Sequence, residues 1–209
     1  MTAPMMFRFL QHLFRTPELL DPEILGDNAR NVAFRVMEEN DIVTCMSFYR
    51  ANEAHFPRGQ SERYEAELRR REFLTLMATR DDKPVGCCGI NYMGSIEGFP
   101  VATLCFGMVD PAHQRRGIGT AQVLVRFALL TPVNGFAIVA MNAVPDSIWF
   151  YRRFGFDFSR EARAADGGTY PFSAIKLPQS LIDKCRLVLA ERNITYPDVR
   201  GRIPNCPLD

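Results

Sequence analysis

The sequence has 209 residues and a formal net charge of +1, with 47% hydrophobic and 23% charged residues. This composition is close to that of ordinary globular proteins and excludes wholesale disorder or a fibrous architecture. The length suits one domain with extensions, and the near-neutral charge gives no general electrostatic reason to bind nucleic acid or an anionic membrane.

Residues 1–30 look like an N-terminal extension, with a short amphipathic helix followed by an irregular, proline-containing segment. The apolar stretch near the start is interrupted by Arg8, Gln11 and His12, which argues against a signal peptide. No apolar run is long enough to span a bilayer. We therefore expect a cytoplasmic protein with no membrane or nucleic-acid partner.

The next segments predict a strand over residues 31–37 and a helix within residues 38–56, where apolar side chains recur at helical spacing. Residues 61–72 are highly charged and lack glycine and proline. They predict an exposed helix whose Glu and Arg side chains pair along its surface.

Three strand-like runs come next, and short turn-forming segments separate them. They cover residues 73–80, 84–93 and 99–109, and they predict an antiparallel meander. After a glycine-containing turn, the remaining predicted elements are a helix (120–130), a buried strand (134–144), a short helix (145–153), two closing strands (154–159 and 170–177) and an amphipathic helix (178–193).

The glycine-containing turn lies within residues 110–126, "DPAHQRRGIGTAQVLVR". A dinucleotide-binding turn would need a third glycine where Gln122 stands, and an acid near the end of the next strand. No Asp or Glu occurs from Pro111 through Pro145. A P-loop would need a lysine after Gly119, where Thr120 stands. Both classes of nucleotide site are therefore excluded.

A different anion site remains compatible with this turn. Glycines let the backbone approach a ligand closely, and the N–H groups at a helix start attract an anion together with the helix dipole. Arg115, Arg116 and Arg126 lie in the same acid-free segment and favour an anion locally. We expect a pyrophosphate site here.

The turn resembles the signature of the GNAT N-acetyltransferase family, Q/R-x-x-G-x-G/A, which is matched by Gln114, Gly117 and Gly119. The segment "SIWFYRRFGF" resembles a second family pattern, A-x-x-L/F-Y-x-x-x-G-F, with serine in place of alanine. Two motifs in register are more specific than either alone. The order of strands and helices from about Asn31 to Leu177 also fits.

The resemblance implies an α/β (α+β) fold, with a mixed central sheet of six to seven strands flanked by helices. The acetyltransferase domain would cover residues 31–177, and residues 178–209 would form a C-terminal helix and tail. The strand before the turn and the strand ending near Met141 would splay apart, so that the thioester of the acyl donor enters between them.

The implied acyl donor is acetyl-coenzyme A, with its pyrophosphate on the turn and its pantetheine arm along the preceding strand. Val144 stands where many relatives carry an asparagine, which lies two residues earlier here. The implied coenzyme-binding residues are Met108, Val109, Gln114, Arg115, Arg116, Gly117, Ile118, Gly119, Thr120, Asn142 and Arg152.

Direct acetyl transfer to an amine needs a base, a donor for the oxyanion and an acid for the departing thiolate. In the family, a tyrosine on the helix after the splayed strand often protonates the thiolate, and Tyr151 occupies that position. A phenol, with an ordinary pKa of about 10, suits a thiolate of similar basicity. On periodicity alone, Tyr151 would be a core aromatic residue.

The pattern does not identify the general base. Some relatives carry a glutamate on the strand before the turn, but Thr103 stands there, and residues 101–109 contain no acid. A water relay, or Glu53, His55 or Glu97, would have to serve. We expect His55 to be the best titratable candidate, since it follows the first helix in a segment that lines the acceptor pocket in this family.

The six cysteines and three histidines are scattered without the spacing of metal ligands, so we expect reduced thiols and no metal site. The implied acceptor is a primary amine of a small molecule, peptide or protein. The missing strand glutamate leaves an alternative open, a non-catalytic coenzyme A-binding sensor or scaffold. The helices predicted at both ends suggest self-association, such as a homodimer.

Overall fold

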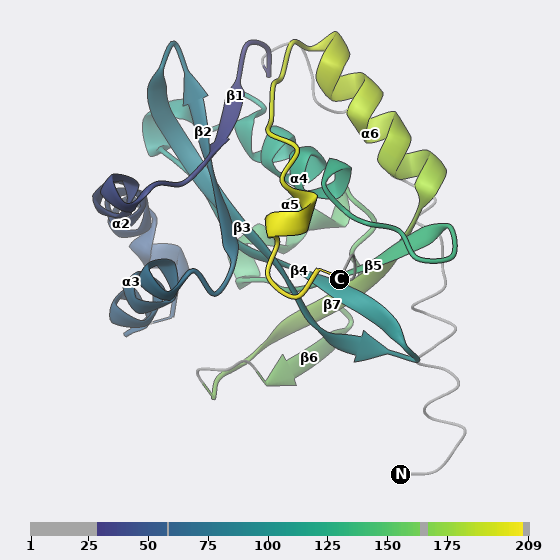
Figure 1. Cartoon of the computed structure of the whole chain (residues 1–209). Helices are drawn as coiled ribbons and strands as arrows, with labels where there is room; N and C mark the ends of the chain where they lie inside the picture. Colours follow the sequence, from purple (N-terminus) through teal and green to yellow (C-terminus); the bar gives the residue numbers. More distant parts are fainter. Residues whose placement is uncertain (1–28, 58, 164–166, 207–209) are drawn as a thin grey trace.

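The computed structural model describes residues 29–57, 59–163 and 167–206, and these residues contain one seven-stranded sheet in the order β1-β2-β3-β4-β5-β7-β6 (Figure 1). Every neighbouring pair is antiparallel except β4 and β5, which run parallel. The expected mixed sheet is therefore confirmed. The strands are β1 (Ala33–Val36), β2 (Leu74–Arg80), β3 (Lys83–Ile96), β4 (Phe99–Val109), β5 (Phe136–Asn142), β6 (Arg160–Arg163) and β7 (Thr169–Pro178).

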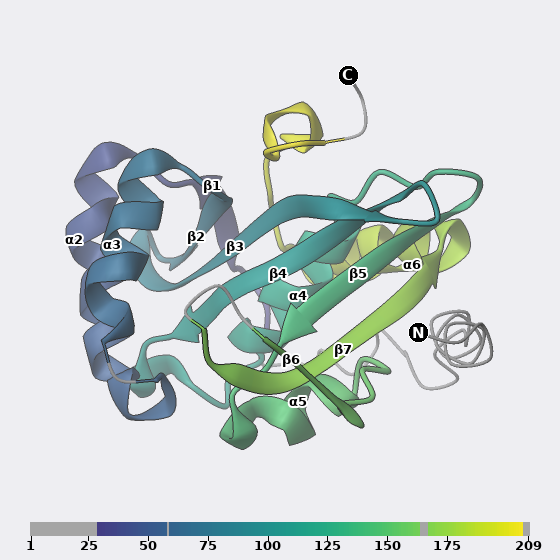
Figure 2. The same cartoon turned by 90° about the horizontal axis from the view of Figure 1, so that it is seen from below.

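Helices cover both faces of this sheet, with α2 and α3 beside each other and α4 and α6 on the opposite side (Figures 1 and 2). Helix α4 lies between the sheet and α6, and all its residues from Thr120 to Ala128 are buried. A helix that is apolar around its circumference belongs in a core, which explains this central position. The helices are α2 (Ile42–Ala51), α3 (Gln60–Arg70), α4 (Ile118–Ala128), α5 (Ile148–Arg152) and α6 (Gln179–Glu191).

The predicted strand at residues 154–159 is wrong. This segment is irregular, and the partner of β7 is β6, which begins only at Arg160. The alternating Phe154, Phe156 and Phe158 imitate a strand pattern, but all three are buried in the main core, where Phe154 and Phe156 pack against the ring of Phe127. Anchoring in the core, rather than strand pairing, explains their spacing.

Helix α3 carries the predicted surface pairs, Arg63 with Glu67 at 2.6 Å and Arg69 with Glu65 at 2.7 Å. The helix is not exposed all round, however, because Leu68 and Tyr64 are each only 1% exposed. The prediction of an exposed helix over residues 61–72 overlooked this apolar stripe.

The parallel pair β4–β5 is short. Residues Val101 to Thr103 pair with Ile138 to Ala140, and β4 continues beyond this point without β5 beside it. The predicted splay is therefore present. On its other side, β4 contains a bulge, since Phe106 and Gly107 together lie opposite the single residue Cys88 of β3. Phe106 has a φ of 39°, which is uncommon for a bulky residue and typical of a locally strained bulge.

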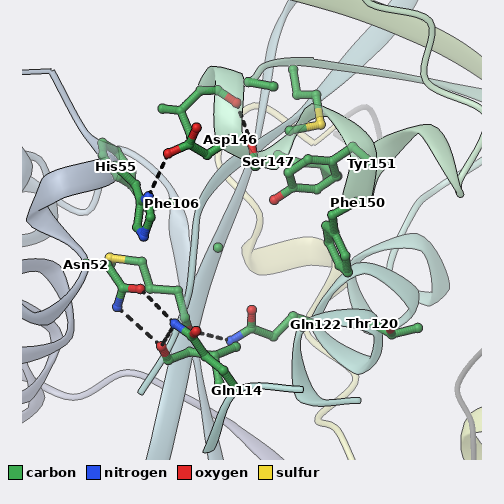
Figure 3. Close-up of a pocket in the computed structure, with 18 of the residues that line it drawn as sticks. Asn52, His55, Phe106, Gln114, Thr120, Gln122, Asp146, Ser147, Phe150 and Tyr151 are labelled. Carbon is green, nitrogen blue, oxygen red and sulfur yellow. Dashed lines mark hydrogen bonds and ion pairs between the residues drawn. The ribbon is translucent and has the colours of Figure 1, made fainter. Parts of the chain in front are cut away.

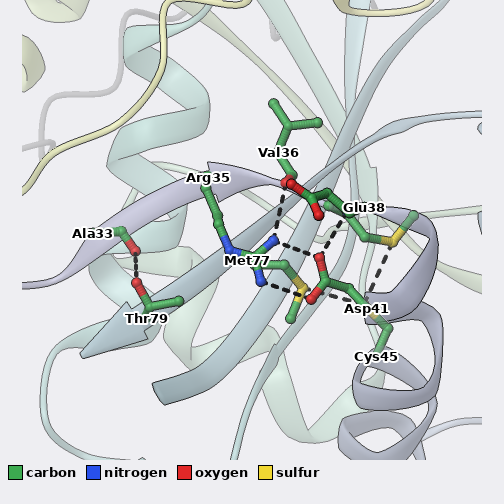
Figure 4. Close-up of polar contacts among 9 residues, drawn as sticks. Ala33, Arg35, Val36, Glu38, Asp41, Cys45, Met77 and Thr79 are labelled. Atoms are coloured by element: carbon green, nitrogen blue, oxygen red, sulfur yellow. Dashed lines mark hydrogen bonds and ion pairs between the residues drawn. The ribbon is translucent and has the colours of Figure 1, made fainter. Parts of the chain in front are cut away.

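An ion pair fixes the connection between β1 and α2 (Figure 4). Asp41 accepts hydrogen bonds from both terminal nitrogens of Arg35, at 2.8 Å from Nη2, and from the N–H of Glu38 at 2.8 Å. The pKa of Asp41 lies below its ordinary value, mainly because Arg35 bonds its charged form; burial opposes this effect and the Glu38 N–H adds to it.

Replacing Asp41 by asparagine is expected to lower the free energy of unfolding at pH 7 by about 1 kcal/mol. The effect is small because Arg35 is 43% exposed to solvent. A depressed folded-state pKa stabilises the protein above the ordinary pKa of about 3.9 and stops doing so as the pH falls through the lower value. Urea unfolding of both proteins at pH 7 and below pH 3 tests this, and an equal difference at the two pH values would contradict it.

The C-terminal region packs onto the sheet. Thr195 forms a bridge with Ala33 of β1, and the N–H of Tyr92 in β3 donates to the carbonyl of Pro204 at 3.0 Å. The expected N-terminal helix lies outside the described residues, and the predicted domain boundaries remain predictions. None of the helices in the described ranges has the length and apolar character needed to cross a membrane.

Candidate active site

A cavity of about 620 Å³ opens where β4 and β5 splay apart (Figure 3). Most of the predicted site residues lie around it. Its lining comes from the end of α2 and the adjoining turn (Asn52, His55, Phe56), β4 (Leu104–Val109), the turn and start of α4 (Gln114, Arg115, Gly117, Gly119, Thr120, Gln122), the end of β5 with the two residues after it (Met141–Val144), and the α5 region (Asp146, Ser147, Trp149–Tyr151, Arg153).

The turn before α4 borders this cavity through Gly117, Gly119 and Thr120. Gly117 is the N-cap residue, with a φ of 75°, and as a glycine it has no side chain to bond the first-turn amides. A left-handed residue followed by helical ones makes a concave group of N–H donors that suits an anion, and the helix dipole adds to the attraction. Ile118 is buried, so its side chain cannot take part, although its backbone N–H belongs to this group.

Gln114 lines the cavity, and hydrogen bonds to neighbouring residues hold its side chain. Its side-chain amide donates to Oδ1 of Asn52 at 3.1 Å and to the carbonyl of Val109 at 3.4 Å. Asn52 also donates to the Val109 carbonyl, at 3.2 Å. These bonds tie the turn to the end of α2 and to the last residue of β4. Asn52 was not among the residues predicted from the sequence.

Gln122, on helix α4, bonds the backbone of the same strand, β4. Its side-chain amide donates to the carbonyl of Met108 at 2.8 Å and to that of Cys87 at 3.2 Å. In the sequence it stood out only as the residue that replaces a glycine. Arg126 is only 1% exposed. Its guanidinium lies in the interior beneath the sheet, and the expectation that its charge favours an anion nearby stays a prediction.

Tyr151 lies in α5 with its hydroxyl directed toward the interior of the cavity (Figure 3). Its Oη is 3.2 Å from the point where a Cβ on Gly107 would stand, so the absence of a side chain there lets the phenol approach β4. The rings of Phe150 and Phe156 pack edge-on against it, with centroids at 4.9 and 6.2 Å. Tyr151 is thus both a packed aromatic residue and a cavity-lining one.

His55 and Asp146 meet on the other side of the cavity (Figure 3). Nδ1 of His55 lies 3.1 Å from Oδ2 of Asp146, and both side chains are more than half exposed. A carboxylate on Nδ1 fixes the orientation of the ring and leaves Nε2 to accept a proton. Asp146 was missed, although it is the first acid after the acid-free segment of the sequence.

The remaining predicted residues divide into two groups. Asn142 and Val144 line the cavity, as do Met108 and Val109. Glu53, Arg116 and Arg152 do not line it, and Arg153 lies there instead of its neighbour. Glu97 is in the tight turn between β3 and β4, away from the cavity-lining residues. No group of three or more His, Cys, Asp or Glu in the described ranges is arranged to hold a metal ion.

A model of the acetyltransferase (GNAT) family matches residues 39–156, which is more than half of the chain. The chain therefore belongs to the GNAT family of acetyltransferases, whose acyl donor is acetyl-coenzyme A. No curated protein matches the sequence.

Solved structures agree with this fold. An aminoglycoside N(6')-acetyltransferase from Legionella pneumophila has a TM-score of 0.58 at 15% identity, over 74% of this chain and 96% of the other. A GNAT-family protein from Desulfovibrio desulfuricans has a TM-score of 0.51 at 19% identity, over 71% and 99%. An aminoglycoside acetyltransferase in complex with coenzyme A has a TM-score of 0.53 at 17% identity, over 74% and 99%.

Proposed function

We propose that this acetyltransferase moves the acetyl group of acetyl-coenzyme A to a primary amine by direct attack within the cavity at the β4–β5 splay. The observation that carries the proposal is the meeting, in one cavity, of an uncapped helix start, the Tyr151 hydroxyl and the His55–Asp146 pair. These groups match the three tasks of binding the coenzyme, protonating a thiolate and deprotonating an amine.

The backbone N–H groups from Gly117 to Thr120 would bind the diphosphate, with Arg115, Arg116 and Arg153 providing positive charge nearby. From there the pantetheine arm would run along Met108 and Val109, where β5 no longer covers β4. This places the thioester near the bulge. A backbone N–H of the bulge would then donate to the thioester oxygen as negative charge develops on it.

In the transfer step, Nε2 of His55 accepts a proton from the acceptor amine, whose nitrogen attacks the thioester carbon. The carbon–sulfur bond breaks, and the Tyr151 hydroxyl gives its proton to the departing sulfur. Asp146 holds the imidazole in position through the contact at Nδ1. Among the cavity-lining residues that the structure describes, Asp146 carries the one carboxylate.

Replacing His55 by glutamine is expected to lower kcat about tenfold at pH 7. The loss is smaller than is usual for an enclosed general base, because water reaches this exposed site and can accept the proton instead. The Asp146→Asn protein should lose less activity and keep the same KM for acetyl-coenzyme A. Thiol release measured at saturating coenzyme tests both expectations. Unchanged kcat in both variants would reject His55 as the base and favour a water relay.

The proposed acceptor is a primary amine of a small molecule, peptide or protein, and the cavity holds too few carboxylates to favour a polycationic acceptor. A panel of amines assayed for coenzyme-dependent thiol release tests the activity as a whole, and a lack of turnover with every amine would count against it. The non-catalytic sensor is not favoured, because a candidate base now lies in the cavity. A cytoplasmic location and a homodimer remain predictions.

A further inference from the structure

Arg126 is a buried cation with an unusual set of partners. It is 1% exposed, and its hydrogen bonds run from Nε to the carbonyl of Gln122 at 3.0 Å, and from Nη1 to the carbonyls of Gly89 and Cys105 at 3.4 and 3.5 Å. Within the residues that the structure describes, it forms no ion pair with a carboxylate. Burying a charge without an opposite charge is costly, so this position needs a physical reason.

Part of the reason is the bulge in β4. Gln122 and Arg126 are one helical turn apart on α4 and donate to carbonyls on the two sides of the bulge. Gln122 bonds Cys87 and Met108 on one side, and Arg126 bonds Gly89 and Cys105 on the other. All four carbonyls belong to residue pairs that flank the bulge. The neutral side-chain amide of Gln122 is enough to bond the carbonyls on the first side. Hydrogen bonding to carbonyls therefore does not by itself explain why the residue on the second side, Arg126, carries a charge.

The position of the charge provides the other part. A Cβ on Gly107 would stand 3.4 Å from Nη2 of Arg126 and 3.2 Å from Oη of Tyr151. The guanidinium and the phenol therefore approach the same side of Gly107, one from beneath the sheet and one from α5. Gly107 itself lines the cavity.

We propose that Arg126 is a positioning residue for acetyl transfer, whose buried charge stabilises the coenzyme A thiolate where Tyr151 protonates it. The inference rests on the proposed function. It adds a fixed positive charge on the same side of Gly107 as the Tyr151 hydroxyl, which favours negative charge on sulfur without touching the coenzyme. A buried guanidinium acts strongly on a nearby sulfur that it does not touch, because little water screens its charge.

The other titratable groups near Arg126 are Cys88 of β3, Cys105 of β4 and Tyr151 of α5, and Glu67 of α3 acts on Cys105 from the other helix layer. Burial raises the pKa of Cys88 to about 11 and that of Cys105 to about 12, although the charge of Arg126 opposes both shifts. Both thiols therefore stay protonated up to pH 9, and a titration seen between pH 7 and 9 would not come from them.

Calorimetry with coenzyme A and with desulfo-coenzyme A, which lacks the thiol, tests the inference without an acceptor. In the wild-type protein, the affinity for coenzyme A relative to the desulfo compound should rise about tenfold from pH 7 to 9, because a nearby cation favours the thiolate. Arg126→Met should abolish this rise, and Arg126→Lys should retain most of it. Arg186→Met is the matched control, since Arg186 also donates to a backbone carbonyl, that of Ala128, away from the cavity.

A flat affinity ratio in the wild-type protein, or an unchanged rise in Arg126→Met, would overturn the inference while leaving the proposed function intact. Should Arg126→Met fail to fold, the change of the affinity ratio with pH in the wild-type protein and in Arg126→Lys still tests the inference. If the wild-type protein bound neither compound, the proposed function would fail as well. As a second readout, Arg126→Met should lower kcat about tenfold in the wild-type background and much less in Tyr151→Phe, because both changes affect the same sulfur.

Discussion

The Tyr151→Phe protein should show a kcat about 100-fold lower than that of the wild type, with an unchanged affinity for acetyl-coenzyme A. The phenol lies beside Gly107 in the cavity, where the thioester sulfur would leave, and phenylalanine removes the proton donor while keeping the ring. Packing against Phe150 and Phe156 should survive the change, so the protein should unfold at nearly the same temperature.

Thiol release at saturating acetyl-coenzyme A and acceptor measures this loss, and calorimetry of coenzyme binding checks that the site is intact. Tyr151→Leu is a useful comparison, because it should lose activity and also stability through the missing ring contacts. A kcat within twofold of the wild type in Tyr151→Phe would mean that solvent protonates the thiolate, and the assignment of Tyr151 would then fall.

Replacing Gly119 by glutamate should weaken coenzyme binding at least about tenfold, or about 1.4 kcal/mol, without destabilising the protein. The new Cβ would stand 3.5 Å from the ring of Phe150 and 3.9 Å from Val109, which is ordinary contact distance. A carboxylate in the first turn also suits the helix dipole of the unliganded protein. Gly119 lines the cavity, so the same carboxylate would lie near the bound diphosphate and repel it.

Gly201→Glu is the matched control, because a Cβ there would meet nothing within 4 Å. Calorimetric titration with coenzyme A and thermal unfolding of all three proteins separate binding from stability. Wild-type affinity in Gly119→Glu would place the diphosphate elsewhere, and a loss of stability in parallel with affinity would attribute the effect to the fold.

Sequence patterns predicted most of the fold because the signals for it are local. Alternation of apolar residues predicted the meander, which the structure confirms, and the Gly117–Gly119 turn between a strand and a helix predicted where an anion would bind. The segment 154–159 shows where such signals fail. Its phenylalanines alternate as in a strand, but their large rings pack in the core without a backbone partner, and periodicity does not distinguish these two situations.

The contacts that complete the site are non-local and leave no pattern in a single sequence. His55 and Asp146 are separated by 91 positions, and Asn52 and Gln114 by 62. Arg126 illustrates a further difficulty, because an arginine in a helix ordinarily points to solvent. Only the bulge in β4, with the flanking carbonyls that Arg126 bonds and the small Gly107, shows why this one is buried.

The central claim is that the backbone amides at the start of α4 bind a diphosphate. A crystal structure with coenzyme A bound tests it most directly. The account predicts diphosphate oxygens about 2.7–3.2 Å from N–H groups between Gly117 and Thr120, with the thiol between β4 and Tyr151. A coenzyme bound elsewhere, with this turn empty or closed by the protein's own side chains, would contradict it.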